Sequence, residues 1–280
     1  MNRPAIVITI LALFLCASSA NAQNLEESLR SDYQKKAFFL RYFYQGTELQ
    51  YDRNGDLIGP GKSGAWTLGR VQVDSMKLSP GALRIEGHRA AEHYDSKKQR
   101  FETVRLKEKI RIELQRSDDP QQLTAALQRV FLHNSAELVS ALPPYWLPYM
   151  NGTARHAAEV AAQLPAVDPT SPNTVKLARP WNPSEVLKVG GDVKAPKVTY
   201  APDPEYDEFA KQAHVEGMVR FRVIVDEQGL PRDIEITQPI GFGLDEKALE
   251  AISTWRFEPA KRGDQPVKVQ INIEVNFRLY

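Results

Sequence analysis

The sequence predicts an α+β protein in which a strand-rich N-terminal domain precedes a smaller C-terminal domain with an antiparallel sheet. The chain has 280 residues, more than one domain of typical size needs. Apolar residues recur at every second position in short segments on both sides of a proline-rich stretch, which is the period of half-buried strands. We therefore predict an N-terminal segment over 1–22, domains over 23–164 and 192–280, and a linker over 165–191.

The N-terminal domain is predicted to place a meander of strands ahead of one or two helices. Residues 71–73, 83–85 and 104–114 mark strands at spacing two. A helix follows at Asp119, which can cap it, and Pro120 suits its first turn. The apolar face of this helix comprises Leu123, Leu127, Val130 and Phe131, and a second helical stretch covers 136–142.

The first 22 residues are typical of a secretory signal peptide. Arg3 precedes an apolar run over 5–17, and residues 20–22 have the small-residue pattern of a cleavage site. The run is shorter than the roughly 20 apolar residues that a spanning helix needs. We therefore expect an exported mature chain that begins at Gln23 and has no membrane span. An uncleaved membrane anchor is the alternative.

The C-terminal domain is predicted from a helix, a hairpin, a second helix and a final strand. Residues 205–215 form a short helix candidate, and alternating segments over 219–225 and 234–236 flank a turn. The second helix begins near Asp245, because an acidic side chain is stabilised at a helix N-terminus. Its packing face comprises Leu244, Ala248, Ile252 and Trp255, and Trp255, Phe257 and Phe277 are expected in the core.

The final segment alternates without interruption over 267–279, which predicts a strand about twice as long as those of the hairpin. If this strand lies at the sheet edge, its excess length has N–H and C=O groups without a partner in the domain. Such an edge can accept an extended peptide from another protein, which is β-augmentation. On geometry alone, pairing with a second copy in a homodimer and simple fraying are the alternatives.

A series of ordered motifs runs through the C-terminal domain. The motifs are Pro204-Glu205-Tyr206, Gly217, Gly229, Gly243-Leu244-Asp245-Glu246-Lys247-Ala248, Trp255-Arg256-Phe257-Glu258-Pro259-Ala260, Gly263, Pro266-Val267 and Val275-Asn276-Phe277. In this order they resemble the TonB C-terminal domain family over about residues 190–280. The resemblance implies an αββαβ module of the bacterial periplasm.

The resemblance also implies a partner and a site. Members of the family bind the N-terminal TonB box of outer-membrane receptors as a strand added beside their final strand. The implied peptide site is the edge backbone of Val267, Lys268, Val269, Gln270, Ile271, Asn272, Ile273, Glu274 and Val275. We expect Lys268, Gln270 and Asn272 to tune the register of the bound peptide.

The chain departs from the energy transducers of this family. Those proteins carry an N-terminal membrane helix and a long spacer rich in Pro, Glu and Lys, whereas this sequence has a cleavable segment, a folded domain and a short linker. We therefore predict a periplasmic TonB-like peptide-binding protein of the cell envelope, linked to transmembrane transport through TonB-dependent receptors. The alternatives are a transducer anchored in the inner membrane and an envelope assembly factor that dimerises through its terminal strand.

Composition and motif spacing exclude several other classes. The formal charge of +1 leaves no field that would attract nucleic acid. Cys16 is the only cysteine, which excludes a disulfide framework, a cysteine-ligated zinc site and an iron–sulfur cluster. The stretch Gly61-Lys62-Ser63 fails as a phosphate loop, because Asp56 stands where that loop requires glycine. We predict no enzyme activity, no catalytic residue, no cofactor and no metal site.

Tyr145, Trp146 and Tyr149 lie among prolines that favour an extended segment. These aromatic side chains either pack under the first domain or form an exposed patch for a partner. The sequence leaves both interpretations open.

Overall fold

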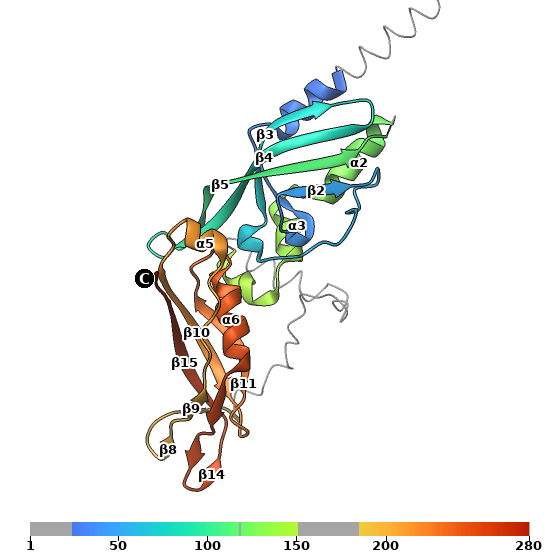
Figure 1. Ribbon diagram of the computed structural model, residues 1–280. Coiled ribbons are helices and arrows are strands. Elements are labelled where there is room, and N and C mark those ends of the chain that lie inside the picture. The colour runs from blue at the N-terminus through green and yellow to red at the C-terminus, as the bar shows by residue number, and fades with distance from the viewer. Residues whose placement is uncertain (1–23, 118, 151–184, 280) are drawn as a thin grey trace, which may run out of the picture. The chain divides into compact units, whose positions relative to one another are not determined.

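The computed structural model describes residues 24–117, 119–150 and 185–279 (Figure 1). The predicted signal peptide over 1–22 and the linker residues 165–184 lie outside this part of the chain. Contacts divide the described residues into two compact units. The first comprises residues 24–62, 70–89 and 107–133, and the second comprises residues 63–69, 90–106 and 134–279 apart from the undescribed stretch.

A six-stranded sheet carries the first unit. Its strands are β1 (Ala37–Leu40), β2 (Glu48–Tyr51), β3 (Arg70–Leu78), β4 (Ala82–Asp95), β5 (Arg100–Gln115) and β6 (Phe131–Leu132), in the order β2-β5-β4-β3-β1-β6. β2 pairs with β5 in parallel, and β1 pairs with β3 and β6 antiparallel. The end of β4 and the start of β5 belong to the second unit. The predicted strand-rich α+β class is confirmed.

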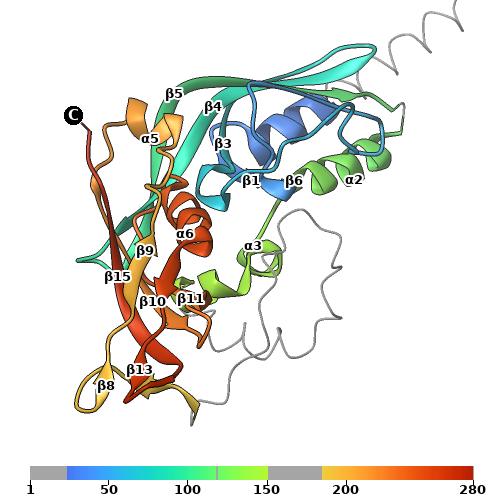
Figure 2. The same ribbon diagram turned by 60° about the horizontal axis from the view of Figure 1, so that its bottom comes forward.

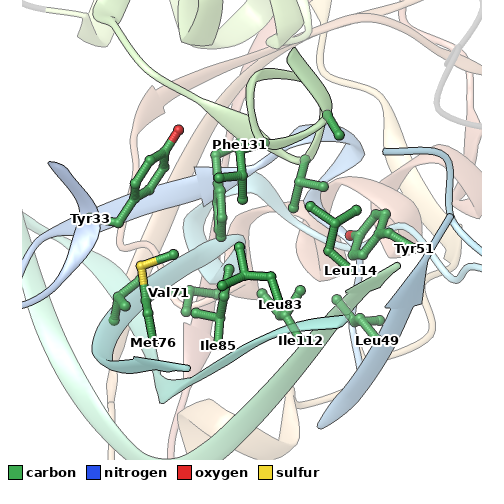
Figure 3. Close-up of a cluster of buried hydrophobic side chains, with 14 of the residues drawn as sticks. Tyr33, Leu49, Tyr51, Val71, Met76, Leu83, Ile85, Ile112, Leu114 and Phe131 are labelled. Atoms are coloured by element: carbon green, nitrogen blue, oxygen red, sulfur yellow. The ribbon is translucent and has the colours of Figure 1, made fainter. Parts of the chain in front are cut away.

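The core of the first unit forms between this sheet and the helix α2 (Pro120–Val130). Asp119 caps α2 by accepting a hydrogen bond from the backbone N of Gln121 at 2.9 Å, as the sequence predicts. Phe131 was expected on the helix, but it begins β6 instead. The buried set includes Leu49, Tyr51, Val71, Leu83, Ile85, Ile112, Leu114, Leu123, Leu127 and Phe131, several of which Figure 3 labels.

The second unit contains a four-stranded sheet of order β11-β10-β15-β7 and two smaller sheets, β12-β9 and β14-β13-β8. The strands are β7 (Leu187–Lys188), β8 (Val193–Lys194), β9 (Lys197–Tyr200), β10 (Gly217–Val225), β11 (Pro231–Gln238), β12 (Arg256–Glu258), β13 (Lys261–Arg262), β14 (Gln265–Pro266) and β15 (Val269–Phe277). Its helices after the linker are α5 (Glu208–Gln212) and α6 (Leu244–Thr254). The predicted order of helix, hairpin, helix and final strand is confirmed.

α6 packs on the β10–β11 hairpin (Figure 1). Leu244, Ala248 and Ile252 are fully buried on its predicted face. Gly243 precedes the helix at φ 74°, a left-handed conformation that glycine adopts without steric cost. The expected core is confirmed for Phe257 and Phe277, which are buried, whereas Trp255 is partly exposed just beyond α6. α5 is shorter than the predicted helix over 205–215.

The predicted difference in strand length is wrong. β10 and β15 each have nine residues, and they pair antiparallel over their full length from Gly217↔Phe277 to Val225↔Val269. The alternation over 267–279 overestimates the strand, since Val267 and Lys268 precede it in a loop. Any open backbone on β15 must therefore lie on its second side, away from β10.

Three segments that precede the predicted linker belong to the second unit. They are the η2 turn (Trp66–Leu68), the tip of the β4–β5 hairpin, and residues 134–150 with α3 (Ser135–Ala141) and η3 (Pro144–Tyr149). Contacts therefore group some residues before position 164 with the C-terminal module. The domain boundary at residue 164 stays a prediction. Trp146 is fully buried and packs edge-on against Trp66 and Phe101, with ring centroids 5.4 and 5.7 Å away.

Candidate functional site: an open edge of the C-terminal sheet

β15 has a full partner on one side and a short partner on the other. β10 pairs with all nine of its residues, whereas β7 pairs in parallel with Val269 and Gln270 alone. No other described strand pairs with β15. Within the described part of the chain, its second side is therefore open from Ile271 to Phe277.

The direction of the open backbone groups follows from one hydrogen bond. The backbone N of Leu187 donates to the carbonyl O of Lys268 at 2.9 Å, so the carbonyl of residue 268 faces away from β10. Backbone groups of alternate strand residues face the same side. Gln270, Asn272, Glu274 and Asn276 therefore direct their N–H and C=O groups outward. β7 covers Gln270, which leaves Asn272, Glu274 and Asn276 as open donors and acceptors.

A groove of about 620 Å³ borders this edge. Residues 270–274 of β15 line it together with Val198 of β9, and both views show β9 beside β15 (Figures 1 and 2). Val198 is 55% exposed and Val189 is 42% exposed, which is unusual for large apolar side chains. The other apolar contributors are Ala195, Pro196, Trp255, Phe257, Ile271 and Ile273.

The outer face of β15 is polar. Gln270, Asn272, Glu274 and Asn276 are exposed, and Arg220 Nε lies 2.9 Å from Glu274 Oε1 on the neighbouring strand. An added strand would thus place alternate side chains over an apolar groove and over a charged, solvated face.

The opposite side of the sheet is occupied. The Tyr149 hydroxyl donates to the backbone O of Ile236 in β11, and η3 contacts this strand. The segment that follows β11 pairs with β4, since the N of Tyr94 donates to Ile240 O at 2.9 Å and the N of Phe242 donates to Glu92 O at 3.0 Å. The aromatic segment thus packs on the C-terminal module. These contacts leave fewer backbone N–H and C=O groups of β11 open to another protein.

The predicted site residues fall into three groups. Val267 and Lys268 lie before β15, and the N of Val267 already donates to Ala260 O at 2.9 Å. Val269 and Gln270 lie under β7, while residues 271–275 line the open part of the edge. Lys268 Nζ lies 3.7 Å from Glu185 Oε2 and 3.6 Å from Glu227 Oε1, so two carboxylates hold its side chain.

The far wall of the groove was not predicted from the sequence. Val189 and Val198 come from a stretch with many Pro and Gly residues, where no strand period is visible. All four residues of β9 are exposed, so this strand shows no alternation in burial from which it could be predicted. The signal that remained was three valines, Val189, Val193 and Val198, spaced along this segment.

Two neighbouring carboxyl groups lie at the start of α6. Asp245 is fully buried and accepts hydrogen bonds from the backbone N of Ile240 at 2.8 Å and of Gly241 at 2.6 Å. Burial raises the pKa of Asp245, and these two donors oppose the rise. Burial, followed by the charge of Asp245, raises the pKa of Glu246 to about 8. Burial therefore favours the protonated form of both carboxyl groups.

An αββαβ module with one occupied and one open sheet edge is the class of structure that these observations define. The family model described as Gram-negative bacterial TonB protein C-terminal matches residues 202–279. Protein tonB2 of Pseudomonas aeruginosa is 37% identical over 79 residues, which cover 28% of this chain and 29% of that protein. Protein TonB of Vibrio cholerae is 34% identical over 77 residues, covering 27% and 32%.

The solution NMR structure of the Pseudomonas aeruginosa TonB CTD was also found, with 23% identity, a TM-score of 0.27, and coverage of 32% of this chain and 90% of that chain. The chain spans about 30% of the length of the curated relatives it matches. The resemblance is confirmed, since residues 202–279 match the model of the TonB C-terminal domain family.

Among the described residues, none of the helices is both long and apolar enough to cross a bilayer. The described ranges also hold no group of three or more His, Cys, Asp or Glu side chains that could bind a metal ion.

Proposed function

We propose that this protein is an exported periplasmic binding protein that captures the TonB box of an outer-membrane receptor as a strand added to β15. The observation that carries the proposal is the open edge at Asn272, Glu274 and Asn276, beside an apolar groove. Backbone pairing supplies affinity in β-augmentation, and pockets for alternate side chains supply specificity. The function is binding rather than catalysis, and it serves transport through the receptor.

The groove defines the chemistry of the peptide. Side chains on one face of the added strand would contact Val198, Trp255 and Ile271, so we expect apolar residues there. Side chains on the other face would lie near Asn272 and Glu274, so polar or basic residues suit those positions. We therefore expect an extended segment that alternates between apolar and polar residues.

The edge is tested by removing one outward N–H group. Asn272→Pro removes a donor that faces the open side, and proline is tolerated on such an edge. We expect it to weaken binding of a labelled TonB-box peptide from a receptor of the same bacterium at least about tenfold in fluorescence anisotropy. Asn272→Ala is the matched control, because it deletes the same side chain and keeps the N–H group.

Ile271→Pro is not equivalent. The N–H group of Ile271 faces β10, so proline there breaks the ladder inside the sheet and destabilises the domain. Equal peptide affinity of the Asn272→Pro and Asn272→Ala variants, with the native circular dichroism spectrum, would contradict strand addition at this edge. Light scattering with and without peptide separates capture from pairing with a second copy, since a dimer through β15 would dissociate when peptide binds.

A further inference from the structure

We propose that β7 is a resident strand which the receptor peptide displaces, so that the peptide site extends from Asn272 back to Val269. β7 consists of Leu187 and Lys188 and covers the first two residues of β15. The inference rests on the proposed function, because it concerns the same edge and the same peptide. It goes beyond that function by assigning an element of this chain that competes with the peptide.

β7 pairs with β15 in the way that an added strand would. The backbone N of Leu187 donates to the carbonyl O of Lys268 at 2.9 Å, on the side of β15 that faces away from β10. Gln270, the next residue with outward N–H and C=O groups, pairs with Lys188. Asn272 follows on the same side. β7 and the peptide therefore use successive positions of a single row of backbone groups.

The chain that leaves β7 limits the open part of the edge. Because β7 runs parallel to β15, continuing the register from the pair of Gln270 and Lys188 places Val189 level with Ile271. Val189 and Ile271 both line the groove, and Val189 is 42% exposed. A peptide that paired with the whole edge would meet Val189 at one end. Pairing beyond this point therefore requires β7 to leave.

β7 is weakly attached to the sheet. It pairs over two residues and in parallel, which is the less stable of the two strand arrangements. Its side chains bury little surface, since Leu187 is half-buried and Lys188 is exposed. A peptide that spans residues 269–277 would form a longer ladder and would also fill the apolar groove. We therefore expect such a peptide to outcompete β7.

The loop after β7 leaves this strand room to move. A Cβ at Gly190 or Gly191 would meet no atom within 4 Å, so open space surrounds both positions. The loop itself is fixed, since Gly190 and Val193 exchange two backbone hydrogen bonds of 3.1 Å and Val193 is buried. Val193 begins β8, which pairs with β13. β7 can therefore swing about the chain just before this loop while β8 stays paired.

One ion pair favours the attached state of β7. Lys268 Nζ lies 3.7 Å from Glu185 Oε2 and 3.6 Å from Glu227 Oε1, and the lysine side chain is 14% exposed. Glu227 lies in the turn between β10 and β11, which the displacement of β7 leaves unchanged. Glu185 directly precedes β7 and leaves together with it. Removing the charge of Glu185 should therefore weaken the attached state alone.

The test measures how peptide length and the Glu185 ion pair affect binding. It uses the full chain and two labelled TonB-box peptides from a receptor of the same bacterium, one long enough for residues 269–277 and one cut to match residues 272–276. Glu185→Gln should raise the affinity of the long peptide about threefold in fluorescence anisotropy and leave that of the short peptide unchanged. Glu227→Gln is the matched control, because it removes an equal charge from both states. No gain for the long peptide, or an equal gain with the control variant, would overturn the proposal.

Amide hydrogen exchange followed by NMR observes the displacement directly. The N–H group of Leu187 should exchange slowly in the free protein and quickly with the long peptide bound, whereas Gln270 should stay protected because the peptide replaces β7. If Asn272 becomes protected while Leu187 stays protected, the peptide binds beside an attached β7, which overturns this inference and leaves the proposed function intact. If Asn272 stays unprotected with either peptide, the proposed function fails and the inference fails with it.

Discussion

Trp146 and Glu246 join the aromatic segment of the second unit to the first turn of α6. The indole Nε1 of Trp146 donates to Glu246 Oε1 at 3.2 Å. Glu246 is partly exposed as a residue, but its second oxygen, Oε2, is buried and has no hydrogen-bond partner among the described residues. A protonated Glu246 is therefore favoured in the folded protein, because an ionised carboxylate there would be poorly solvated.

The stability of the second unit should fall as the pH rises from about 4.5 to about 8. The pKa of Glu246 is raised from its ordinary value of 4.5 to about 8, so the unfolded chain loses its proton first across this window. Glu246→Gln should reduce this dependence, of which the buried Asp245 keeps a part, and stabilise the protein at pH 8 by on the order of 2 kcal/mol. Thermal melts at several pH values measure it. Glu250→Gln, on the exposed face of α6, is the control, and an equal effect of both substitutions would refute the assignment.

Trp146 should be among the most sensitive positions of the second unit. Its ring is fully buried and packs edge-on against Trp66, Phe101 and Tyr149. Trp146→Ala should cost about 3–5 kcal/mol in the free energy of unfolding, which urea denaturation measures. A cost below about 1 kcal/mol would mean that the aromatic segment does not pack as described.

Gly229 should not tolerate a side chain. It has φ 74°, and a Cβ there would lie 1.8 Å from the carbonyl O of Phe257, where the hairpin turn meets β12. Gly229→Ala should therefore destabilise the domain by more than about 3 kcal/mol. Gly263 also has a positive φ, 59°, but open space around it, so Gly263→Ala should cost only about 1 kcal/mol. Similar costs for the two variants would argue against this close approach.

The sequence predicted those helices and strands that are marked by capping residues or by alternating apolar residues. Asp119 and Pro120 marked the start of α2, and alternating residues marked β3, β10 and β15. The open side of β15 could not be predicted from the sequence. Alternation shows which side chains share a face of the sheet, but not which neighbouring strands pair with β15. The full-length pairing of β10 with β15 explains why the length argument failed.

Long-range packing was the part that the sequence could not supply. The contact of Tyr94 with Ile240 joins a hairpin of the first half to the loop after β11, and no periodicity encodes such a partner.

Amide hydrogen exchange of β15, followed by NMR with and without the receptor peptide, tests the central claim most directly. The account predicts that Ile271, Ile273 and Val275 are protected in the free protein, because their N–H groups face β10. Asn272, Glu274 and Asn276 should exchange quickly in the free protein and slowly with peptide bound. Protection of these three amides before peptide is added, or no change after it, would contradict the account.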